Sequence, residues 1–190
     1  RDARNAVLHC RPGLIATGHH AGDQSETMLY RLLRGSGLAG LAGMLPSTGK
    51  TVRPLLGFSK EELSNWAEEQ SLLWFEDPSN PTSTRGQIRQ WMTSLESIRG
   101  GLEKTMARTA ELLAVDEDCL SALAQQQMVD LWVDDGLDFA TFQRLHPAIK
   151  WRCLRALAHQ KGTRLTRKQV EAVLLDNLSD GGVLPLSNGW

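Results

Sequence analysis

The chain has 190 residues, of which 41% are hydrophobic and 23% are charged, and its formal net charge at pH 7 is -1. This composition is ordinary for a globular protein and excludes general disorder. No apolar run approaches the ~18 residues of a membrane span, and no secretory leader is recognisable, so we expect no membrane partner. The cysteines Cys10, Cys119 and Cys153 are too far apart for a metal or redox pair, which favours a reducing, cytoplasmic location.

Both ends of the chain indicate an internal piece of a longer protein. Residue 1 is Arg rather than Met, and it already lies in a helical pattern that runs to Cys10. Residues 181–190 resemble a strand that has just begun. We therefore expect these last residues to be the start of a truncated C-terminal segment.

The apolar run Leu14 to Thr17 predicts a short buried strand. Residues 18–22 predict a loop, and Asp23 predicts the opening of a helix that stops at Gly35. Strand, loop and helix in this order form the unit of a parallel α/β sheet, whose ligands lie beyond the carboxyl ends of the strands. The sequence therefore predicts a ligand site over residues 19–26.

The glycine-rich segment 35–43 matches no known phosphate-binding loop, so it predicts a short, tightly packed helix. Residues 52–56 are predicted to be extended. Ser59 and Glu62 form a capping box that predicts the start of a helix, with Trp66 on its inward face.

The polar stretch 76–86 contains two prolines and predicts a loop. From Leu102 onward, apolar residues recur at steps of three and four, which predicts helices. One of them is predicted to begin at Pro147, and the last is predicted to be capped by Thr166 with Gln169. The expected fold class is α/β, a partial parallel sheet layer, followed by an all-α domain. The expected domains are residues 1–89 and 90–180.

Charge is unevenly distributed in the second half of the chain. Residues 144–168 include eight Lys or Arg and no acid, whereas residues 116–138 include seven acids and no Lys or Arg. The ordinary explanation is a solvated helix face. So long a basic stretch slightly favours a polyanion partner. No motif that reads a base sequence accompanies the stretch, so we expect contact with the backbone and shape of the partner.

His19, His20, Asp23 and Glu26 crowd into eight residues at the predicted ligand edge. On one helical turn the two carboxylates point the same way, where they could bind an ammonium, assist its deprotonation or hold a metal. The alternative is a helix cap, which the spacing alone favours because an acid followed three residues later by Glu is a capping-box variant. A metal site is less favoured, since the pattern matches no zinc spacing.

Several ordered motifs together resemble the tRNA(Ile)-lysidine synthetases of the N-type ATP pyrophosphatase, or PP-loop, superfamily. Residues 17–27 and 33–41 match that family's His-His-x-Asp-Asp-Gln-x-Glu-Thr and Leu-x-Arg-Gly-x-Gly patterns except at one position. Arg-Pro-Leu-Leu at 53–56, Trp-x-Glu-Asp-x-Ser-Asn at 74–80 and Arg-Gly-Gln-Ile-Arg at 85–89 follow in the family's order.

The resemblance implies a two-step reaction and an adenine-nucleotide-hydrolase-like sheet followed by a tRNA-binding linker domain. ATP, with Mg²⁺, adenylates the C2 oxygen of the wobble cytidine in isoleucine tRNA with the anticodon CAU. The ε-amine of free L-lysine then attacks C2 and expels AMP, leaving lysidine. A homodimer is a further possibility that the sequence does not decide. The family's phosphate loop, Ser-Gly-Gly-x-Asp-Ser, is expected to precede Arg1, so we expect the fragment alone to be inactive.

The resemblance also implies roles for individual residues. Asp23 and Glu26 would hold the lysine, His19 would lie near the nucleotide and the reacting base, and Arg85 would stabilise charge on the α-phosphate. Further residues would shape the pocket: Arg34, Asp77, Asn80 and Arg89. The tRNA backbone would be bound by Arg152, Arg155, Arg164, Arg167 and Lys168.

Two departures from the family pattern leave alternatives open. Gly22 replaces the first acid of the Asp-Asp pair, which we expect to be tolerated because Asp23 has the better role. Gly86 replaces an asparagine and loosens the loop around Arg85. The alternatives are a non-catalytic tRNA-binding module with a decayed α/β part, a related tRNA-modifying enzyme such as a cytidine thiolase, and a metal-dependent hydrolase. The thiolase needs cysteine pairs that this chain lacks, and the hydrolase would use His19, His20, Asp23 and Glu26.

Overall fold

The computed structural model describes residue 10 and residues 12–75, 83–133, 136–160, 162–163 and 165–174. The chain forms two compact units, residues 1–117 and 118–190. Apart from Cys10, the predicted first helix lies outside the described residues, as does the segment 181–190. The domain boundary expected at Arg89 stays a prediction; that residue lies within helix α5 (Thr84–Ile98).

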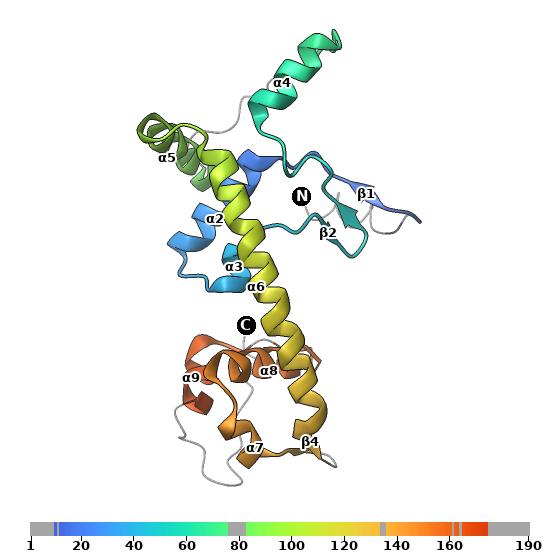
Figure 1. The fold of residues 1–190 in the computed structure, drawn as a ribbon, viewed down its shortest axis with the longest axis vertical. Coiled ribbons are helices and arrows are strands. Elements are labelled where there is room, and N and C mark those ends of the chain that lie inside the picture. Colours follow the sequence, from blue (N-terminus) through green and yellow to red (C-terminus); the bar gives the residue numbers. More distant parts are fainter. Residues whose placement is uncertain are drawn as a thin grey trace. The chain divides into compact units, whose positions relative to one another are not determined.

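The first unit contains a small mixed sheet of three two-residue strands, β1 (Ile15–Ala16), β2 (Ser47–Thr48) and β3 (Thr51–Val52). Their order is β1-β3-β2, with β1 parallel to β3 and β2 antiparallel to β3. The parallel pair requires a crossover, which helices α2 (Ala21–Leu33) and α3 (Leu38–Leu41) supply (Figure 1). The predicted strand and the α/β character of this unit are confirmed. The burial predicted for this strand is wrong, since Leu14 is 72% exposed and Ala16 is also exposed.

The extended segment predicted over residues 52–56 is wrong beyond its first residue. Strand β3 ends at Val52, and Pro54 to Gly57 form a turn. The Leu56 N–H donates to the Arg53 carbonyl oxygen at 3.3 Å, which closes the turn. Proline fixes its own φ near the value that the second position of such a turn requires.

Helix α2 begins two residues earlier than predicted, because His20 and not Asp23 is its N-cap. The His20 Nδ1 atom accepts the Gly22 N–H at 3.0 Å, and the Asp23 carboxylate accepts the His20 N–H at 3.1 Å. These reciprocal bonds satisfy two backbone donors that a helix start leaves free. The predicted stop is confirmed, since the helix ends at Leu33 and Gly35 adopts a φ of 70°.

The glycine-rich segment forms the short, tightly packed helix predicted for it, and Gln24 of α2 fixes its far end. The Gln24 side chain is 3% exposed. Its Oε1 accepts the Met44 N–H at 2.7 Å, and its Nε2 donates to the Met44 carbonyl oxygen at 3.1 Å. A Cβ on Gly43 would lie 2.6 Å from that Oε1, and the φ of Gly43 is 70°, so glycine is required there.

Replacing Gln24 with Ala should lower the free energy of unfolding by about 2–4 kcal/mol, because the half-buried backbone groups of Met44 lose their partners. Urea denaturation followed by circular dichroism measures this change. Gln90→Ala, at an exposed position of α5, is the matched control and should change stability by less than about 0.5 kcal/mol. Equal stability of the two variants would contradict a structural role for Gln24.

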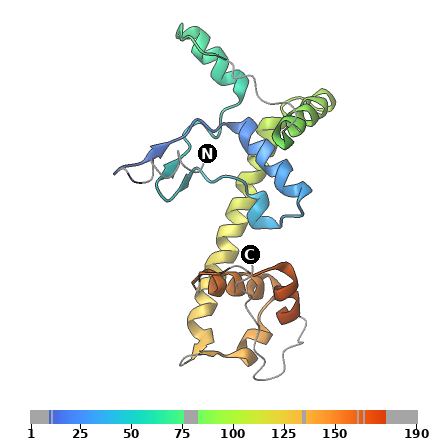
Figure 2. The same ribbon diagram turned by 180° about the vertical axis from the view of Figure 1, so that it is seen from behind.

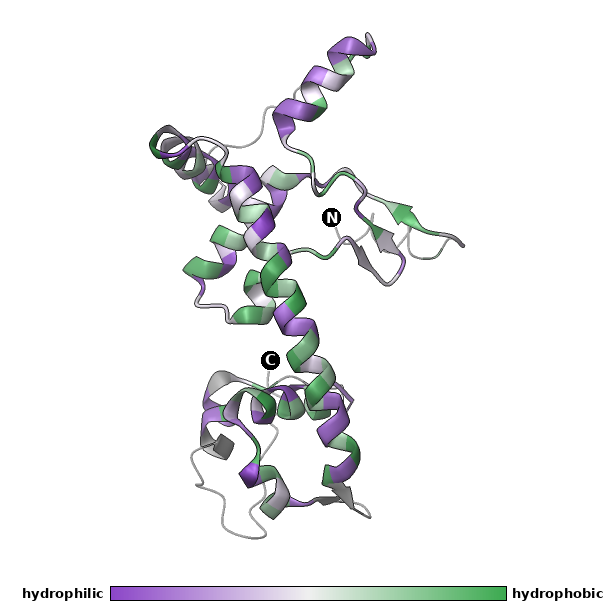
Figure 3. Ribbon diagram, in the orientation of Figure 1, coloured by the Kyte–Doolittle hydropathy of each residue, from purple (hydrophilic) through white to green (hydrophobic). Residues whose placement is uncertain are grey.

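The first unit also contains helix α4 (Lys60–Glu69), α5 and the start of α6 (Leu102–Leu131). The capping box of Ser59 and Glu62 is confirmed. The inward position predicted for Trp66 is wrong, since this side chain is 56% exposed on a helix that is mostly hydrophilic (Figure 3).

The loop predicted over residues 76–86 is wrong at its end, and its first part lies outside the described residues. Helix α5 begins at Thr84, because the Ser83 hydroxyl accepts the Gly86 N–H at 3.0 Å and caps it. Gly86 is therefore buried in the first turn of a helix. The side chain of Ile88 is also buried.

Helix α2 packs against α5, and it lies beside the start of α6 in both ribbon views (Figures 1 and 2). The Ser25 hydroxyl donates to the carbonyl oxygens of Ala21, at 2.9 Å, and Glu103, at 3.1 Å. Ser25 is fully buried, so these bonds join α2 to α6 in the interior of the unit.

The second unit is helical, with one short hairpin that the sequence did not predict. It contains the second half of α6, β4 (Trp132–Val133), β5 (Gly136–Leu137), α7 (Phe139–Arg144), α8 (Pro147–Gln160) and α9 (Arg167–Leu174). The helices predicted from Leu102 and from Pro147, and the cap of α9 by Thr166 and Gln169, are confirmed.

The core of the second unit is built from buried residues of α6, α7, α8 and α9. They are Ala124, Leu131, Phe142, Ile149, Cys153, Leu154 and Val170. Burial raises the pKa of the Cys153 thiol.

Among the described residues, no helix has both the length and the apolar character needed to cross a membrane.

Candidate functional site

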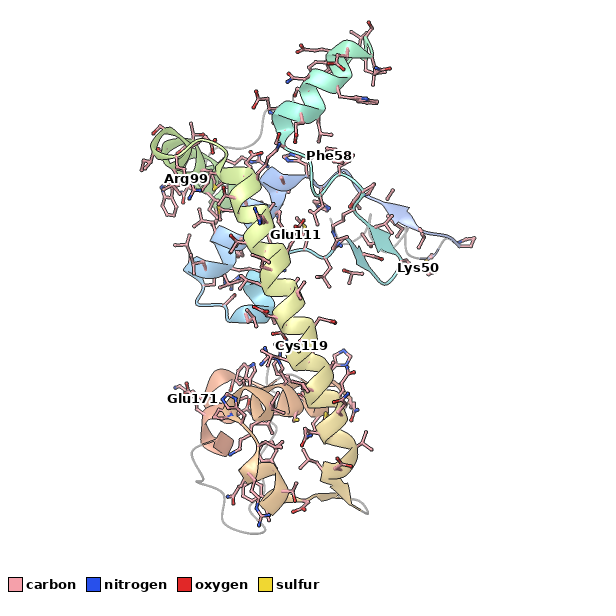
Figure 4. The ribbon with its side chains drawn as sticks, viewed as in Figure 1. Lys50, Phe58, Arg99, Glu111, Cys119 and Glu171 are labelled. Atoms are coloured by element: carbon pink, nitrogen blue, oxygen red, sulfur yellow. The ribbon has the colours of Figure 1, made fainter. Side chains whose placement is uncertain are left out.

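The candidate site lies at the N-terminal end of α2, directly beyond the carboxyl end of β1, as predicted. The Thr17 N–H donates to the Val52 carbonyl oxygen at 3.0 Å, which continues the parallel pairing past the strand. The Thr17 hydroxyl lies 2.9 Å from Nδ1 of His19. The Ala21 N–H donates to the carbonyl oxygen of Phe58, a residue labelled in Figure 4, at 2.8 Å. These bonds fix the loop that carries His19.

The two acids of α2 have different partners. The Asp23 carboxylate caps the helix through the His20 N–H and lies 3.5 Å from Nε2 of the same His. The capping box predicted between Asp23 and Glu26 is therefore wrong, because the box joins His20 and Asp23, although Asp23 does take part in the cap. A cap and a ligand contact are compatible, because a carboxylate has acceptor sites beyond the one that a backbone N–H uses.

Glu26 forms an ion pair with Arg89 of α5, whose Nε donates to Oε1. This hydrogen bond raises the pKa of Arg89; desolvation opposes the shift, and the charges of Glu26 and Asp23 add to it. The Glu26 side chain is only 12% exposed. Its second oxygen, Oε2, is buried and has no hydrogen-bond partner among the described residues. Glu26 therefore keeps a desolvated acceptor for a ligand.

A cleft of about 1350 Å³ opens at this end of α2. Within the described residues, five carboxylates and three Lys or Arg side chains line it. Glu62 and Lys104 form a pair at 2.6 Å, which together with bonds from Ser59 lowers the pKa of Glu62 to about 2. The excess of carboxylates favours a cationic ligand over a phosphate in this part of the molecule. The charged lining residues are Glu26, Glu61, Glu62, Glu96, Glu103, Lys60, Arg89 and Lys104.

The other residues expected at the pocket are not all brought together. Arg85 is exposed on α5, one turn before Arg89 and on the same side of that helix. Arg34 lies at the opposite end of α2, about 16 Å along the helix axis from Asp23, and its guanidinium contacts the Tyr30 ring at 5.3 Å. Asp77 and Asn80 lie outside the described residues.

Only some side chains of the basic stretch, residues 144–168, are exposed. Arg155 and Lys168 are exposed, whereas Arg152 is half-buried and its Nη1 donates to the Ala148 carbonyl oxygen at 2.8 Å. Arg164 and the side chain of Arg167 lie outside the described part.

Glu103 and Lys104 of α6 line the cleft, although the sequence did not mark them. They reach it through the long-range packing of α6 on α2, for which no local motif exists. No three His, Cys, Asp or Glu side chains gather in a metal-binding arrangement in the ranges that the structure describes.

The strand, crossover helices and site define an α/β domain that places its candidate ligand residues at a helix N-terminus beyond a strand. A family model described as the PP-loop domain matches residues 2–96. The chain belongs to the PP-loop family, as its motifs predicted.

Curated proteins named tRNA(Ile)-lysidine synthase are similar to most of the chain. The protein from Pseudomonas putida is 38% identical over 183 residues, which cover 87% of this chain and 43% of the relative. That from Mycolicibacterium paratuberculosis is 36% identical over 184 residues, covering 94% and 57%. That from Rhodococcus erythropolis is 34% identical over 193 residues, covering 96% and 59%. The chain thus spans about half the length of these relatives.

Proposed function

We propose that this protein is a tRNA-modifying ligase that uses ATP to join lysine to C2 of the wobble cytidine in isoleucine tRNA with the anticodon CAU. The observation that carries the proposal is the acidic cleft at the start of α2, where Glu26 keeps a buried acceptor with no protein partner. The names of the relatives and the PP-loop family support the same reaction class.

The reaction needs a cation site because lysine arrives as an ammonium. In the first step, the C2 oxygen attacks the α-phosphorus of ATP and pyrophosphate leaves. In the second, the ε-ammonium gives up a proton, the amine nitrogen bonds to C2, and the bond from C2 to the AMP oxygen breaks. Oε2 of Glu26 accepts a charge-assisted hydrogen bond from the ammonium, and Asp23 adds a second negative charge on the same helical turn.

Arg89 acts on the lysine through Glu26. Its guanidinium fixes the position of that carboxylate, since the pair joins α2 to α5. His19 faces the nucleotide and base, and Arg85 stabilises charge on the α-phosphate. Three residues complete the pocket in this proposal: Arg34, Asp77 and Asn80.

Other parts of the protein contribute most of the binding of the two polyanionic substrates, ATP and tRNA. The PP-loop family supports ATP use, and Mg²⁺ accompanies the ATP phosphates in this proposal. The basic stretch binds the tRNA backbone, through exposed side chains such as Arg155 and Lys168. A tRNA substrate places the reaction in the cytoplasm.

The test is a mass measurement of nucleosides from tRNA incubated with ATP, L-lysine and the protein as its gene encodes it. We expect the wobble cytidine of the isoleucine tRNA transcript to gain one lysine with loss of water. Methionine tRNA, which has the same anticodon, is the control and should stay unmodified. A protein that binds the isoleucine tRNA but leaves its wobble cytidine unchanged would instead be the non-catalytic binding module, which the departures at Gly22 and Gly86 favour.

A further inference from the structure

We propose that Glu103, on the first turn of α6, supplies the carboxylate that position 22 lacks, and that it positions the lysine ammonium together with Glu26. This inference rests on the proposed function and adds a residue that the motifs do not contain.

The first argument is the space at position 22. A Cβ built on Gly22 would lie 2.9 Å from Oε1 of Glu103 and 2.7 Å from Cε1 of His20. Carbon atoms do not approach other groups so closely without displacing them. A side chain at position 22 and the present place of the Glu103 carboxylate therefore exclude one another. The glycine leaves the space, and Glu103 occupies it from a different helix.

The second argument is that the protein holds Glu103 in this place. Its carbonyl oxygen accepts the buried Ser25 hydroxyl at 3.1 Å, which ties the first turn of α6 to α2 across 78 residues of sequence. Its Oε2 lies 3.5 Å from the Lys60 backbone nitrogen. The residue is half-buried and is therefore not a freely solvated surface group.

The third argument is the charge of the cleft. Glu26 and Glu103 both line it, from α2 and α6. Most other charges there are already engaged: Glu62 with Lys104, and Glu96 with the backbone N–H groups of Gly101 and Leu102. An ammonium has three N–H donors, which matches acceptors that converge from two helices.

Replacing Glu103 with Gln is expected to raise the KM for lysine by about 10- to 100-fold, as for the loss of one charge-assisted hydrogen bond. The KM for ATP should change by less than about 2-fold. Glu103→Asp should recover part of the lysine affinity. Glu111→Gln, further along α6 and labelled in Figure 4, is the matched control and should leave both constants unchanged.

A second pair of variants tests the exchange of carboxylates between positions 22 and 103. Gly22→Asp alone should weaken lysine binding, because the new side chain meets Glu103 in the same space. Combined with Glu103→Ala, which vacates this space, it should restore the KM for lysine to within a few-fold of the parent value. The coupling between the two positions should thus be strongly non-additive.

The rise in melting temperature on adding free lysine separates failure of this inference from failure of the proposed function. Lysine should stabilise the parent protein, as any ligand of the folded state does, and stabilise Glu103→Gln less. Equal lysine-induced shifts in both proteins would overturn the role of Glu103 and leave the proposed function standing. A parent that neither binds nor transfers lysine would overturn both.

Discussion

Asn in place of Asp23 is expected to reduce lysine transfer at least ~100-fold and to leave tRNA binding within a few-fold of the parent. Asn keeps an oxygen that accepts the His20 N–H, so the cap of α2 survives while the negative charge is lost. Single-turnover formation of tRNA that contains lysidine measures the first effect, and equilibrium titration with labelled tRNA measures the second.

The alanine variant separates the two roles of this carboxylate. Asp23→Ala loses both charge and cap, so it should also lower the free energy of unfolding by about 1 kcal/mol, whereas Asp23→Asn should unfold like the parent. If Asp23→Asn transfers lysine at close to the parent rate, the carboxylate is only a helix cap, and the resemblance has assigned it a role that it does not have.

Neutralising Arg152, Arg155, Arg164 and Arg167 together is expected to weaken tRNA binding and to reduce its dependence on salt. Each lost phosphate contact removes about 0.7–0.9 from the slope of log K against log salt concentration, so four contacts would lower the slope by about 3. Binding measured at several salt concentrations gives this slope directly. The effect should be the same for different tRNA sequences, because backbone contacts do not read bases.

A smaller, matched comparison uses side chains that the structure shows to be exposed. Arg155→Gln with Lys168→Gln should lower the slope, whereas Arg99→Gln with Arg108→Gln, two exposed arginines of the first unit, should not. Arg99 follows the end of α5 and is labelled in Figure 4. Equal slopes for both pairs would mean that the basic stretch only faces solvent.

The fold was predictable where local patterns determine it. Three such patterns are the apolar run that forms β1, the capping box of α4 and the proline that opens α8. Each of them depends on only a few neighbouring residues. The start of α2 was misplaced because His is not among the usual N-cap residues, although its ring nitrogen accepts the same backbone bond. Trp66 was misplaced because periodicity shows which residues share a face and not whether another element covers it.

The site was predictable in the part that is contiguous in sequence. His19 to Glu26 lie together because they share one loop and one helical turn. The motifs also named Arg89, and the structure pairs it with Glu26. Glu103 could not be found, because its approach depends on how α6 packs on α2 and on the missing side chain at Gly22. Such tertiary contacts produce neither a hydrophobic periodicity nor a motif of fixed spacing in a single sequence.

The central claim is that the acidic end of the cleft receives the side-chain ammonium of lysine. The most direct measurement is calorimetric titration of the protein, as its gene encodes it, with L-lysine and with L-norleucine, which has a methyl group where lysine carries its aminomethyl group. We expect lysine to bind at least ~10-fold more tightly than norleucine, because only lysine carries the cation that these carboxylates match. Equal affinity for the two amino acids would contradict the account.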